Sequence, residues 1–71
     1  MKMHGRLFYN PKLDRIDIIF DDGTFYDGLH CGECFDVYIN HKWVFTRIEM
    51  SDNWYLVGLK DQKLIGLKVR I

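Results

Sequence analysis

The sequence has no excess of charge of either sign and no long apolar run. Ten basic and ten acidic side chains cancel, so no global field attracts nucleic acid or an anionic membrane. No run of about 18 apolar residues is present to span a bilayer, and no charged-then-apolar N-terminal segment resembles a signal peptide. We therefore expect a cytoplasmic protein that does not bind membranes.

Cysteine and serine are scarce, which restricts the chemistry. Cytoplasmic thiols stay reduced, so Cys31 and Cys34 do not imply a disulfide; one of them is expected to pack as a small buried hydrophobe. With His30 they have the spacing of half a zinc knuckle, but there is no second Cys-x-x-Cys pair to complete four ligands. Ser51, in a predicted turn, is the single serine. We expect no enzyme, no metal and no cofactor, and keep a zinc or thiol-reactive site at Cys31, Cys34 and His30 as an alternative.

Apolar and aromatic residues, in contrast, are abundant. They make up 48% and 15% of the 71 residues, which is typical of a globular chain. This length predicts one domain over residues 1–71 with a small core. Residues 1–36 hold four bases and seven acids, and residues 37–71 hold six and three. A barrel mixes strands from both halves, so this asymmetry along the chain need not become a separation in space.

Short alternating runs of β-branched and aromatic residues replace any helical period. They predict strands over residues 5–9, 15–20, 35–39, 43–50, 54–59 and 64–71, with a brief continuation at 24–26. Turn residues separate them, and Gly28 and Gly32 predict a sharp reversal in the 28–34 loop. Five or six short antiparallel strands predict an all-β fold, a small SH3-like partly open barrel. The C-terminal strand is expected to return beside an early strand.

The strand predicted over residues 43–50 carries most of the candidate binding residues. Val44, Thr46 and Ile48 share the face expected to be buried, and the odd-numbered residues share the other face. Those odd-numbered residues are Trp43, Phe45, Arg47 and Glu49. An Arg47–Glu49 ion pair is expected to hold the guanidinium over Trp43 or Trp54. In the alternative interpretation, Trp43 and Phe45 form a second small core under the 28–34 loop.

This stripe predicts a non-catalytic module that binds a protein or peptide. Tryptophan and arginine are the residues that dominate binding hot spots. The candidate surface is Trp43, Arg47, Glu49 and Trp54, with His30 in the 28–34 loop at its rim. An alternative is single-stranded nucleic acid stacking on the same aromatics. Its phosphates would meet the cations Arg47, Lys42, Lys68 and Arg70. Strand edges could also support a homodimer.

Several segments together resemble a family of very small Gram-positive bacterial proteins. They are Leu29-His30-Cys31-Gly32-Glu33, the strand Trp43-Val44-Phe45-Thr46-Arg47-Ile48-Glu49, and the segments 54–58 and 66–71. The resemblance runs from Gly5 to Ile71. It is to a domain of unknown function whose members look like accessory proteins of mobile elements. It implies a compact β fold in the bacterial cytoplasm and supplies no activity.

Overall fold

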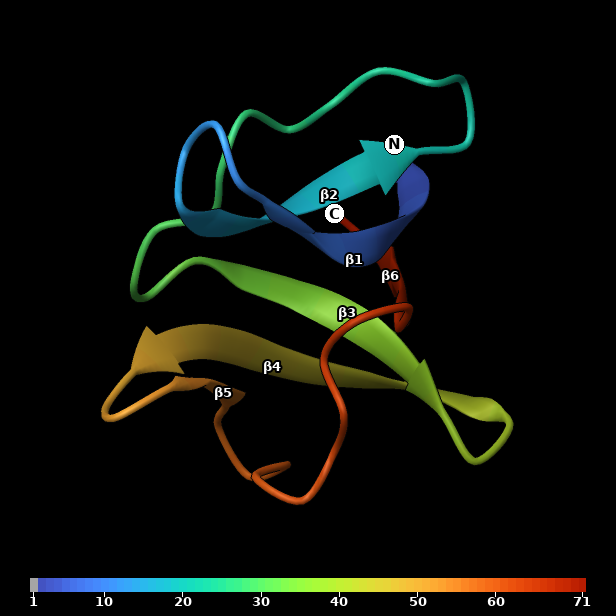
Figure 1. Ribbon diagram of the computed structural model, residues 1–71. Helices are drawn as coiled ribbons and strands as arrows, with labels where there is room; N and C mark the ends of the chain where they lie inside the picture. Colours follow the sequence, from blue (N-terminus) through green and yellow to red (C-terminus); the bar gives the residue numbers. More distant parts are fainter. Residues whose placement is uncertain (1) are drawn as a thin grey trace.

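The strands of the chain join edge to edge into one rolled antiparallel sheet (Figure 1). The computed structural model describes residues 2–71. Its strands are β1 (His4–Asn10), β2 (Arg15–Phe20), β3 (Cys34–Ile39), β4 (Lys42–Met50), β5 (Trp54–Leu56) and β6 (Lys68–Arg70). Their order across the sheet is β2-β1-β6-β3-β4-β5. The C-terminal strand β6 lies between β1 and β3. The all-β, partly open arrangement predicted from the sequence is therefore confirmed.

Turn residues fix the two tight hairpins. Asn40 and His41 both have positive φ angles, 52° and 66°, which is the backbone of the type I′ turn that matches the twist of antiparallel strands. They join β3 to β4 with Ile39 opposite Lys42. In the β1–β2 turn the side-chain oxygen of Asn10 accepts a hydrogen bond from the Lys12 amide at 3.1 Å. These turns set the register, and the register decides which side chains share a face.

The rolled sheet encloses its core on the inner face. In Figure 1, β1 and β2 form the upper half, β3, β4 and β5 form the lower half, and β6 joins them at one side. The buried apolar side chains are Leu7, Ile16, Ile18, Phe20, Leu29, Phe35, Val37, Ile48, Leu56 and Val69. Thr46 and Ile48 of β4 are buried and Val44 is half-buried, while Phe45 is 68% exposed. The predicted alternation of β4 is thus confirmed.

The two outer strands of the sheet, β2 and β5, are bridged by side chains. The Arg15 guanidinium of β2 lies 5.9 Å from the ring centre of Trp54 in β5. Along the other edge of β2, residues 24–29 add backbone pairing, with the Tyr26 amide donating to the Ile18 carbonyl at 3.0 Å. The predicted continuation of the sheet at 24–26 is confirmed. The edge of β2 is therefore partly covered, which protects a small β protein from edge-to-edge association.

Candidate functional site

Side chains of four strands line up across the convex side of the sheet. In one row His4 of β1, Arg70 of β6, Asp36 of β3 and Phe45 of β4 are successive cross-strand partners. We call this side of β1, β6, β3 and β4 the outer face. It comprises His4, Arg6, Cys34, Asp36, Tyr38, Trp43, Phe45, Arg47, Glu49, Lys68 and Arg70. The predicted binding stripe of β4 is one edge of this wider surface.

Trp43 is the packing centre of the outer face. The Arg70 guanidinium lies 4.3 Å from its ring centre, and the rings of Tyr38 and His4 meet it edge-on at 5.1 and 5.5 Å. The prediction that Arg47 covers Trp43 or Trp54 was wrong. Arg70 and Arg15 take those positions because β6 and β2 bring them there. Trp43 is half-buried by these neighbours.

Asp36 holds the arginine that covers Trp43. Its carboxylate is buried and accepts from Arg70 Nε at 2.8 Å and Lys2 Nζ at 3.1 Å. The hydrogen bond from Arg70 lowers the pKa of Asp36 below its ordinary value, against the opposing effect of burial and with a further contribution from Lys2. Charge-assisted bonds of this kind fix geometry. Asp36 therefore orients Arg70 over the indole.

Replacing Asp36 with asparagine is expected to destabilise the fold in a pH-dependent way. Because the folded-state pKa is lowered, the stabilisation is complete above the unfolded value of about 3.9 and is lost as the pH falls towards the folded value. Urea midpoints of wild type and Asp36→Asn should differ by a constant amount at neutral pH and converge below about pH 4. The exposed Asp52→Asn serves as control. A wild-type advantage unchanged at about pH 3 would contradict this assignment.

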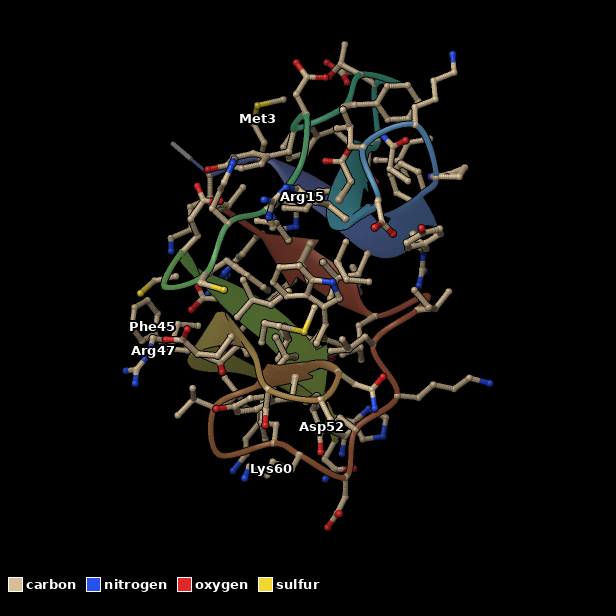
Figure 2. The ribbon with its side chains drawn as sticks, turned by 60° about the vertical axis from the view of Figure 1, so that its left-hand side comes forward. Met3, Arg15, Phe45, Arg47, Asp52 and Lys60 are labelled. Atoms are coloured by element: carbon tan, nitrogen blue, oxygen red, sulfur yellow. The ribbon has the colours of Figure 1, made fainter. Side chains whose placement is uncertain are left out.

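Phe45 and Arg47 are both exposed on the outer face. Figure 2 shows both side chains projecting outward together from β4. The Arg47–Glu49 ion pair predicted from the sequence is confirmed, with Nε to Oε2 at 2.9 Å. A shallow hollow of about 160 Å³ beside them is lined by Cys34, Phe45, Thr46, Arg47 and Val57. The alternative of a second core under the 28–34 loop is wrong, because Phe45 is 68% exposed.

Trp54 does not belong to this surface. The β4–β5 register places Tyr55 opposite Glu49 and Trp54 opposite Met50. Trp54 is therefore on the inner side, where it packs against the core and under Arg15. The sequence grouped Trp54 with Trp43 because the register of so short a strand is not visible in the sequence.

His30 lies in a loop that β4 holds in place. The Gly32 amide donates to the Ile48 carbonyl at 2.8 Å, and the Ile48 amide donates to the Glu33 carbonyl at 3.0 Å. Glu33 also accepts from the His30 amide at 2.6 Å and from the Tyr26 hydroxyl. Leu29 is buried, while the His30 side chain is exposed. The Leu-His-Cys-Gly-Glu turn is thus a structural unit, and it brings His30 towards the Arg47–Glu49 end of β4.

Both cysteines are free and exposed. The expectation that one of them is buried was wrong, because Cys31 lies in an exposed turn and Cys34 lies on the outer face opposite Arg47. Within residues 2–71 no group of three His, Cys, Asp or Glu side chains is close enough to hold a metal ion. The zinc alternative at Cys31, Cys34 and His30 therefore gains no third or fourth ligand from the part of the chain that is described.

Sequence reasoning missed the contribution of β3 and β6. In the sequence Asp36 and Tyr38 alternate with Phe35 and Val37, and Lys68 and Arg70 alternate with apolar residues. The side of the sheet on which these four side chains lie could therefore be predicted from the alternation in the sequence. The contacts of these side chains with Trp43 could not be predicted from the sequence, because they depend on β6 lying between β1 and β3.

Comparison with known proteins gives a family and a fold relative. The model of a domain of unknown function, DUF5348, matches residues 5–71. A crystal structure of a protein from Ruminococcus gnavus, a structural genomics target, is 57% identical, with a TM-score of 0.87. The match covers 96% of this chain and 99% of that one. No curated protein matches the sequence. Within residues 2–71 no helix is long and apolar enough to cross a membrane.

Proposed function

The chain belongs to the DUF5348 family, and we propose that it is a non-catalytic module that binds a protein or peptide through its outer face. The observation that carries the proposal is the exposed Phe45 on β4 beside Arg47, whose guanidinium is bonded to Glu49. A large apolar ring next to a guanidinium is the combination that hot spots use. Arg47, Glu49 and Phe45 are the contact residues, with Trp43 behind them and His30 at the rim.

Pre-organisation supports this function. Arg47 is held by Glu49, and Arg70 is held by Asp36. Side chains fixed before binding lose less conformational entropy when a partner docks. These charged groups are paired with each other, so the face presents a fixed arrangement of side chains. Such an arrangement suits recognition better than catalysis.

The aromatic rings suit nucleic acid less well. Stacking of bases needs free ring faces. Arg70 lies over Trp43, and the Lys68 ammonium lies 5.4 Å from the ring centre of Tyr38. Two of the four predicted phosphate contacts, Arg47 and Arg70, are already paired with carboxylates. The outer face therefore suits a peptide better than a single nucleic acid strand.

The cytoplasm remains the proposed location. Two exposed free thiols close together in sequence suit a reducing compartment, where they do not oxidise to intermolecular disulfides.

The proposal predicts that Phe45→Ser combined with Arg47→Ala abolishes partner capture. Wild type and variants immobilised on resin are incubated with lysate of the source cells, and retained proteins are identified by mass spectrometry. A matched control is Phe25→Ser, which removes an equally aromatic, half-exposed side chain outside the outer face. We expect proteins retained by wild type and Phe25→Ser and lost from the double variant. Binding of a captured protein is then measured in purified form. If wild type, Phe25→Ser and the double variant retain the same proteins, or if none of them retains any protein, the proposal is contradicted.

A further inference from the structure

The outer face continues into a basic groove. An open hollow of about 490 Å³ lies between the 63–67 segment and strands β1, β6 and β3. Its lining is Arg6, Tyr38, Lys63, Ile65, Gly66, Leu67 and Lys68. Three of these seven residues are cationic and none is acidic. Tyr38, which lines the groove, is also the cross-strand partner of Trp43. The groove is therefore continuous with the part of the outer face that carries Phe45.

The groove concentrates charge although the chain as a whole is neutral. β6 pairs with β1, which brings Lys68 opposite Arg6. The two carboxylates of the outer face, Asp36 and Glu49, are each already bonded to cations. The positive charge of the groove is therefore not neutralised by the carboxylates of the outer face. A local excess of positive charge attracts an anionic group even on a neutral protein.

The cations of the groove are positioned in different ways. Arg6 donates from Nη1 to the Gly66 carbonyl at 2.9 Å, which fixes its guanidinium against the 63–67 segment and leaves other N–H donors for a ligand. Lys68 rests over Tyr38. Ile65 is 49% exposed at the same place. The groove thus offers charge and apolar contact together.

We propose that this groove binds a carboxylate-bearing segment of the protein partner, an acidic peptide stretch in which aspartate or glutamate stands next to an apolar residue. The inference rests on the proposed function and names the chemistry of its partner. Carboxylates complement Arg6, Lys63 and Lys68, and an apolar side chain complements Ile65 and Leu67. A nucleic acid strand would use the charges but not the apolar contact, and it would find the Tyr38 ring beneath Lys68.

The test is a fluorescence anisotropy titration with three labelled probes. They are a short peptide of alternating Glu and Leu, the same peptide with Gln for Glu, and a single-stranded oligothymidine. The groove variant is Lys63→Glu with Lys68→Glu. The control, Lys12→Glu with Lys60→Glu, changes the same charge at exposed lysines that do not line the groove. Circular dichroism establishes that both variants fold.

We expect wild type to bind the Glu-Leu peptide more tightly than the Gln-Leu peptide at low salt. The groove variant should lose about tenfold in affinity or more, and the control less than about threefold. Equal losses in both variants, or no preference for the Glu-Leu peptide, overturn the inference. The inference is also overturned if wild type binds the oligothymidine more tightly than the Glu-Leu peptide and the groove variant loses that oligothymidine binding. If the peptide titration fails but capture of a partner from lysate still requires Phe45 and Arg47, the groove inference is wrong and the proposed function is retained.

Discussion

Replacing Asp17 with alanine is expected to lower the free energy of unfolding by about 3–5 kcal/mol. Asp17 is fully buried on β2. Its Oδ1 accepts from the Gly28 amide at 2.7 Å and from the Ile18 amide at 2.8 Å, and its Oδ2 accepts from Asn10 Nδ2 at 3.0 Å. Alanine leaves buried donors without a partner, and each such donor costs about 1–3 kcal/mol.

The loss at Asp17 is specific to its three hydrogen bonds. Asp17→Asn keeps one oxygen acceptor and should fall between wild type and Asp17→Ala. Asp22→Ala is the control, because Asp22 is an exposed turn carboxylate that accepts from Thr24, and its loss should be much smaller. Urea unfolding followed by tryptophan fluorescence measures all four proteins. Equal midpoints for Asp17→Ala and Asp22→Ala would show that Asp17 does not anchor the 26–29 segment.

Gly5→Ala is the second large effect, with an expected loss of about 3 kcal/mol. A Cβ at Gly5 would lie 2.4 Å from the Ile19 carbonyl oxygen and 2.8 Å from Ile18 Cγ2. The carbonyl belongs to the backbone of β2, so it cannot move without disturbing the pairing of β1 with β2. Glycine fits here because β2 approaches too closely to leave room for a methyl group.

Gly58→Ala provides the matched comparison. Gly58 has a φ of 79° and open space around its Cα, so alanine there costs only the strain of the left-handed backbone, about 1 kcal/mol. Thermal or urea unfolding of both variants separates steric exclusion from backbone strain. A smaller loss at Gly5 than at Gly58 would contradict the close approach of β1 and β2.

Alternation in the sequence was sufficient to predict the two sides of β4. Thr46 and Ile48 fill the interior and Phe45 and Arg47 face outward, because a strand places successive side chains on opposite sides whatever its neighbours are. The same rule places Asp17 on the other face of β2 from Ile16 and Ile18. It did not reveal that Asn10 and Gly28 bond to the carboxylate, since Asn10 lies at the end of β1 and Gly28 lies in the segment after β2.

Strand order was the information that the sequence lacked. Two arginines far apart in the chain, Arg15 and Arg70, cover the two tryptophans, whereas local spacing favoured Arg47. The basic groove likewise depends on Lys68 lying beside Arg6. Contacts made by partners on neighbouring strands follow from register and order, and neither leaves a periodic signal in one sequence.

The most direct test of the account is an NMR footprint. The ¹⁵N-labelled protein is titrated with a purified protein captured by wild type, and backbone shifts are followed. The account predicts the largest changes at Tyr38, Phe45, Arg47 and Lys68, with little change around Leu13 and Phe25. Changes concentrated at Leu13 and Phe25, with the outer face unaffected, would contradict it.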